Sequence, residues 1–67
     1  MEKVIIWDTE DGPIYADSFC VEYAHMLFDT GLSKPQVIAE LRKSGGLELA
    51  DAAYIVKHLE ANGYVSC

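Results

Sequence analysis

The densest group of potentially reactive side chains lies in the stretch WDTEDGPIYAD, from Trp7 to Asp17. It contains four carboxylates and no basic residue. An EF-hand calcium loop would need acidic ligands at alternate positions, a glycine at the sixth and a glutamate at the twelfth. Counted from Asp8, these last two positions hold Pro13 and Phe19. The stretch therefore does not match a calcium loop, and its Asp-Gly pair predicts a solvated turn instead.

Other side chains that bind metals or act as nucleophiles are sparse. Cys20 and His25 are five residues apart, about 140° around a helix, so they would not face one ion. His58 and Cys67 complete the candidates, and there is no Cys-x-x-Cys or His-x-x-x-His pair. No Gly-x-Ser-x-Gly motif occurs either. We therefore expect no metal, no other cofactor and no enzymatic activity, and we expect reduced cysteines rather than a disulfide framework.

The placement of charge is the most informative feature of the sequence. The net charge is −6, and residues 1–33 account for all of it, with seven acids and one base against four of each in residues 34–67. An acidic half repels phosphates and anionic membranes and attracts basic protein surfaces. The alternative is a surface whose charges only keep the protein soluble. The candidate binding residues are Asp8, Glu10, Asp11, Asp17, Glu22 and Asp29.

Aromatic side chains could anchor such an interface if they are exposed beside the acids. The candidates are Trp7, Tyr15 and Tyr64. The alternative for each is a place in the core, which is the more common environment for aromatic residues.

The length of 67 residues predicts a single domain spanning residues 1–67. A chain this short buries only about 60% of its unfolded surface, so its core is thin. No apolar run approaches the roughly 20 residues needed to span a bilayer, and no basic segment followed by an apolar one begins the chain. We therefore expect a cytoplasmic protein.

The first half of the chain predicts a hairpin followed by a helix. KVIIW, from Lys3 to Trp7, is β-branched and aromatic and predicts a strand, and PIYA, residues 13–16, predicts a short second strand. The following segment predicts a helix that Asp17 or Ser18 can cap and that ends at Gly31. Its expected apolar stripe consists of Phe19, Cys20, Tyr23, Ala24, Leu27 and Phe28.

The second half predicts two more helices and a final strand. Ser33 and Gln36 match a capping box, and the helix they begin ends at the glycine pair 45–46. The third helix is expected to bury Leu49, Ala52, Ala53, Val56 and Leu59 and to end at Asn62-Gly63, before a final strand over residues 64–67. The expected fold is therefore α/β (α+β), with three helices packed on a short antiparallel sheet in the order β-β-α-α-α-β.

Residues 33–65 resemble the core of the winged-helix family. SKPQVIAEL resembles the second helix of that family, and LADAAYIVKHLEANGYV is similar to its third helix and the entry into a wing. This resemblance implies a DNA-binding transcriptional regulator as the alternative function. The bases available for DNA would be Lys34, Arg42, Lys43, Lys57 and His58, whereas Glu48 and Asp51 at the start of the third helix would repel phosphates.

In size and charge, the whole chain looks like the anti-CRISPR proteins of phages and mobile elements, which are small, often acidic, single-domain inhibitors. Those families share no motif, so the resemblance transfers no residue. It implies a monomeric, stoichiometric inhibitor in the cytoplasm of a bacterial host cell, whose carboxylates replace DNA phosphates. The partner would be the basic nucleic-acid-binding surface of a type I CRISPR effector. The two alternatives differ in charge placement, because an inhibitor should gather its acids on one face and a DNA-binding regulator its bases.

Overall fold

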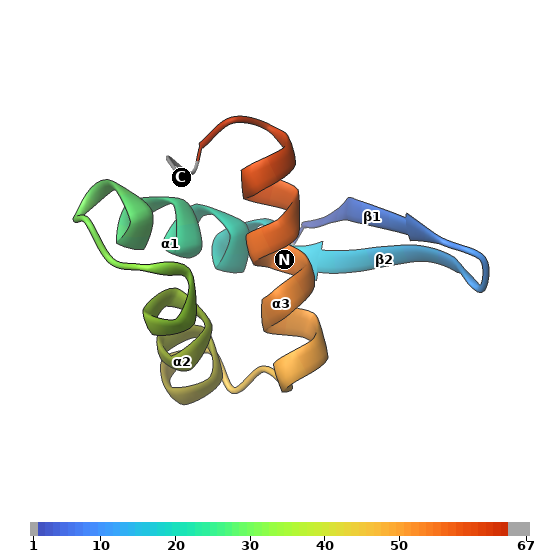
Figure 1. The fold of residues 1–67 in the computed structure, drawn as a ribbon. Coiled ribbons are helices and arrows are strands. Elements are labelled where there is room, and N and C mark those ends of the chain that lie inside the picture. The colour runs from blue at the N-terminus through green and yellow to red at the C-terminus, as the bar shows by residue number, and fades with distance from the viewer. Residues whose placement is uncertain (1, 65–67) are drawn as a thin grey trace.

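The computed structural model describes residues 2–64, which form a β-hairpin followed by three helices. The elements are β1 (Lys3–Thr9), β2 (Gly12–Asp17), α1 (Ser18–Asp29), α2 (Lys34–Ser44) and α3 (Leu49–Ala61). The hairpin extends from one side of the three-helix body, with its turn away from the helices (Figure 1). This arrangement confirms the expected α+β class with helices packed on a short antiparallel sheet.

The final strand is the one expected element that the structure does not show. Tyr64 is not in a strand, and the rest of the expected element lies outside the described residues. In the part of the chain that is described, the sheet has two strands, β1 and β2.

The turn of the hairpin is formed by Glu10 and Asp11. Gly12 follows with a φ of 119°, a value that a residue with a side chain rarely adopts. The Thr9 hydroxyl donates a hydrogen bond to the Gly12 carbonyl oxygen at 2.8 Å and accepts one from the Asp11 N–H at 3.2 Å. The Asp-Gly pair therefore marks the reversal as the sequence predicts.

The two faces of the hairpin have different environments. Ile5 lies directly opposite Tyr15, and the neighbouring pair is Val4 and Ala16. Successive pairs point to opposite faces of the hairpin. A β-bulge interrupts β1 between Ile5 and Trp7. The inner face packs on the helices through Val4, Ile6, Trp7, Ile14 and Ala16. The outer hairpin face, which we define as Lys3, Ile5, Asp8, Pro13, Tyr15 and Asp17, is mostly exposed.

Within residues 2–64 the core is one cluster of eight buried side chains, half of which come from α3. Its members are Ile6, Ala24, Val37, Leu41, Ala52, Ile55, Val56 and Leu59. The expected stripes of the first and third helices supply Ala24, Ala52, Val56 and Leu59 to this core, but two of their members are exposed. Phe19 and Leu49 are 64% and 56% exposed. Each lies in the first turn of its helix, where the neighbouring elements do not cover it.

Local chemistry sets both ends of α2. The Gln36 side-chain oxygen accepts a hydrogen bond from the Ser33 N–H at 2.9 Å, as the capping box predicts. The helix ends at Gly45, where an added Cβ would lie 2.7 Å from the Leu41 carbonyl oxygen, too close for a side chain. An ion pair between Lys34 and Glu60 joins the start of α2 to the end of α3.

Candidate acidic interface

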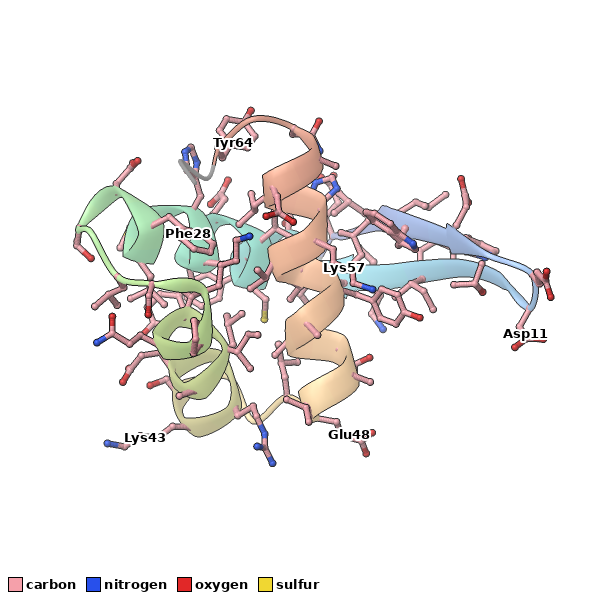
Figure 2. The ribbon with its side chains drawn as sticks, in the orientation of Figure 1. Asp11, Phe28, Lys43, Glu48, Lys57 and Tyr64 are labelled. Atoms are coloured by element: carbon pink, nitrogen blue, oxygen red, sulfur yellow. The ribbon has the colours of Figure 1, made fainter. Side chains whose placement is uncertain are left out.

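The far end of the hairpin carries three of the six predicted binding residues, Asp8 in β1 and Glu10 and Asp11 in the turn. Asp8, Glu10 and Asp11 are all exposed, and none of them forms an ion pair with a described residue. Asp11 marks the end of the hairpin that is farthest from the helices in the view of Figure 2. These carboxylates are therefore accessible to a partner from several directions.

Asp17 lies at the other end of the hairpin, where β2 meets α1. It occupies the N-cap position of α1 with extended backbone angles, but its side chain makes no capping hydrogen bond. Its carboxylate therefore does not bind the free N–H groups at the start of α1. It lines a hollow of about 160 Å³ between the hairpin and the start of α3. The hollow is lined by Lys3, Tyr15, Ala16, Asp17, Leu47, Asp51 and Ile55.

Asp51 also lines this hollow, although the sequence does not single it out as a binding residue for a basic partner. It is exposed in the first turn of α3, and the fold brings it to the same hollow as Asp17. No spacing rule could have found it, because Asp17 and Asp51 belong to different elements. Their proximity depends on how the loop before α3 approaches the base of the hairpin.

The remaining predicted acids, Glu22 and Asp29, lie on α1 away from the hairpin turn. Asp29 lies at the end of α1 that is opposite the hairpin (Figure 1). Its Oδ1 atom is 3.9 Å from Nε2 of His25, whose ring centroid is 4.4 Å from that of Tyr64. The six acids therefore do not form one compact patch. They divide into the hairpin turn, the hairpin base and the exposed surface of α1.

The aromatic candidates also have different environments. Tyr15 and Tyr64 are 56% and 51% exposed, whereas Trp7 is partly buried against the core. Tyr15 alone of the three lies on the outer hairpin face, between the acids of the turn and those of the base.

The bases do not gather on one face. Lys57 places its Nζ atom 5.9 Å from the ring centroid of Trp7 and 5.5 Å from that of Tyr54, within the range of cation–π attraction. Lys34 is paired with Glu60. Lys43 lies at the exposed end of α2, whereas Lys57 lies on α3 beside the hairpin (Figure 2).

A second hollow, of about 260 Å³, lies between α1 and the end of α2. It is lined by Phe19, Cys20, Tyr23, Ser44 and Gly45. Burial raises the pKa of the Cys20 thiol, and the nearby negative charge of Asp17 raises it further. A raised pKa leaves less of the thiolate, the form that attacks electrophiles and binds metals. Among residues 2–64, no three His, Cys, Asp or Glu side chains are grouped so that they could hold a metal ion.

Comparison with known proteins adds no assignment to this geometry. No protein-family model matches the chain, and no curated protein or solved structure matches it. Within the described residues, none of the helices combines the length and the apolar character that crossing a membrane requires.

Proposed function

We propose that this protein is a non-enzymatic binding protein that occupies the basic, nucleic-acid-binding surface of another protein. The observation that carries the proposal is the projecting end of the hairpin, where Asp8, Glu10 and Asp11 are exposed and form no ion pair with another residue of the range 2–64. A narrow element of this kind can enter a groove whose lysines and arginines otherwise hold phosphates. Each exposed charge pair contributes little, so several carboxylates must act together, and their main effects are faster association and selectivity.

The specific form of the proposal is an anti-CRISPR protein that blocks target-DNA binding by a type I effector in the cytoplasm of a bacterial host. The support for this form is the small size of the chain and its net charge of −6. The carboxylates of the turn would replace phosphates against the lysines and arginines of the effector. Asp17 would add to the contact from the hairpin base, whereas Glu22 and Asp29 lie on α1 and would contribute less.

The acids divide among three places, but three of the six lie together at the end of the hairpin, whereas the bases do not gather on one face. This difference favours the proposed function over DNA binding. A winged-helix regulator would need several unengaged bases on one face. Here Lys34 is paired with Glu60, and Lys57 lies over two aromatic rings. The start of α3 carries Glu48 and Asp51, which would repel the backbone of DNA.

The first experiment is fluorescence anisotropy of a labelled random DNA duplex with this protein at low salt, where attraction to phosphates is strongest. We expect no binding. Binding that weakens steeply as salt is added would overturn the proposal and favour the winged-helix alternative.

The second experiment measures binding of target DNA by a purified type I CRISPR effector in the presence of this protein. We expect inhibition, and we expect the double variant Glu10→Lys/Asp11→Lys to lose it. The control is Glu22→Lys/Asp29→Lys, which changes the net charge by the same amount on α1 and should keep most of the inhibition. Equal loss in both variants would mean that overall charge, and not the hairpin, determines binding.

A further inference from the structure

The outer hairpin face exposes two large apolar side chains next to each other. Ile5 and Tyr15 are directly opposite in the register of the two strands, and they are 54% and 56% exposed. Side chains that are opposite on one face of an antiparallel pair are in contact range. Pro13 lies on the same face as Tyr15, two residues before it in β2 and closer to the turn. Burial of this apolar surface would be favourable in a complex.

Carboxylates flank the apolar pair at both ends. Asp8 lies toward the turn, opposite Pro13, and the turn itself carries two more acids. At the other end, Tyr15 shares the hollow at the hairpin base with Asp17 and Asp51. Among the described residues that line this hollow, Lys3 is the one base. An apolar centre with a charged rim is the usual anatomy of a protein interface.

The edges of the hairpin are poorly suited to adding a further strand. The β-bulge between Ile5 and Trp7 interrupts the regular pairing pattern of β1. Pro13 in β2 lacks a backbone N–H. A partner would therefore contact the face of the hairpin through its side chains rather than extend the sheet through its backbone.

We propose that the outer hairpin face is the docking surface for a basic protein segment in which aliphatic side chains alternate with lysine or arginine. Ile5 and Tyr15 would contact the apolar side chains of that segment. The hollow at the hairpin base would receive one lysine or arginine, with its stem against Tyr15 and Leu47 and its charged head near the two aspartates. This inference rests on the proposed function and deepens it by naming the chemistry of the partner surface.

An apolar contact at the centre changes how binding should respond to salt. Attraction between exposed charges is screened as ionic strength rises, whereas burial of apolar surface is not. A mimic that uses its carboxylates alone would lose nearly all its affinity at high salt. Binding through the outer hairpin face would retain at high salt the share of the affinity that Ile5 and Tyr15 contribute.

The test is an NMR titration of the full chain with two short synthetic peptides of equal length and charge, one alternating lysine with leucine and the other lysine with serine. We expect the leucine peptide to bind at least about tenfold more tightly. The largest changes in chemical shift should occur at Ile5, Tyr15, Asp17 and Asp51. Tyr15→Ala should bring the affinity for the leucine peptide closer to that for the serine peptide, with Ile5 keeping its own share of the contact. Phe19→Ala is the matched control, because Phe19 is exposed elsewhere, and it should have no effect.

Three outcomes would contradict the inference, and one of them also bears on the proposed function. Equal affinity for both peptides would overturn the apolar contact and leave a purely electrostatic inhibitor. Chemical-shift changes that are largest at Phe19 and Tyr23 would place the docking surface at the hollow between α1 and α2 instead. If neither peptide binds at low salt, the proposed attraction to basic segments fails as well. The comparison of peptides on the unmodified chain remains decisive if Tyr15→Ala does not fold.

Discussion

Leu41 and Leu49 are the same residue type in opposite environments. Leu41 is completely buried and is among the largest fully buried side chains, whereas Leu49 is 56% exposed. Truncating a buried leucine removes its transfer free energy and leaves a cavity, whereas truncating an exposed one does neither. In a domain this small, one such side chain represents a large share of the free energy of unfolding.

We therefore expect Leu41→Ala to lower the free energy of unfolding by about 2 to 5 kcal/mol. Leu49→Ala should change it by less than about 0.5 kcal/mol. Urea denaturation followed by circular dichroism measures both values. Similar losses in the two variants would mean that Leu49 is buried.

The pKa of Cys20 gives a second prediction for a single residue. Burial, and then the charge of Asp17, raise this pKa in the folded protein, so the folded state favours the protonated thiol. The stabilising effect is fully present at a pH below the thiol pKa of the unfolded chain, and it is lost as the pH rises through the folded value. With Cys67→Ser as background, the pH midpoint for alkylation of Cys20 should be higher in the folded protein than in urea.

The Asp17→Asn variant should lower that midpoint, because it removes the second cause of the shift while keeping the shape of the side chain. Asp51→Asn is the control, since Asp51 is not a cause of the raised pKa. If Asp17→Asn leaves the pH midpoint of alkylation unchanged, burial alone accounts for the raised pKa of Cys20.

The start of α2 depends on a side chain that can be changed without touching the core. Gln36 is exposed, and its side-chain oxygen accepts the hydrogen bond from the Ser33 N–H. The first N–H groups of a helix have no partner within the helix, so this acceptor stabilises the helix end. The Lys34–Glu60 ion pair at the same end is half-exposed, and we expect it to contribute less.

Replacing Gln36 with alanine should lower the free energy of unfolding by about 0.5 to 1.5 kcal/mol. Gln36→Glu should retain the stability, because glutamate keeps the acceptor and places a negative charge near the positive end of the helix dipole. Thermal denaturation of the two variants distinguishes these effects. Equal stability of Gln36→Ala and the unmodified protein would indicate that water replaces the acceptor.

For the molecule as a whole, the dominant electrostatic property is an excess of unpaired acids. The net charge is −6, and among residues 2–64 Lys34–Glu60 is the one ion pair that does not require a protonated histidine. Repulsion between like charges destabilises a compact state, and salt screens that repulsion. The carboxylates that we propose for binding a basic partner therefore lower the stability of the free protein.

Added sodium chloride should consequently raise the melting temperature at neutral pH. The gain should be at most about 1 kcal/mol, or about 4 to 8 °C for a domain of this size. In Glu10→Lys/Asp11→Lys each substitution replaces a negative charge with a positive one, so the net charge moves from −6 to −2 and the salt effect should be smaller. A melting temperature that falls with salt would mean that attractive ion pairs outweigh the repulsion.

The sequence determined the features that depend on a few neighbouring residues. The chain reversal at Asp11-Gly12, the capping box of Ser33 and Gln36, and the glycine stop of α2 all form as predicted, although the turn residues themselves are Glu10 and Asp11. Each feature relies on backbone angles and hydrogen bonds within about four residues. Hydrophobic periodicity likewise placed the three helices, because a helix repeats every 3.6 residues regardless of its surroundings.

Tertiary packing determined which side chains are buried and which exposed side chains lie close to one another. Phe19 and Leu49 fit the helical stripes but lie outside the core, since periodicity gives the direction of a side chain and not the extent of the neighbouring element. The same packing separated Asp29 from the hairpin turn and brought Asp51 to the hollow of Asp17. The sequence alone determined that the chain has an acidic half. Which of these acids share a surface depended on the direction of the hairpin relative to the helices, which no local pattern encodes.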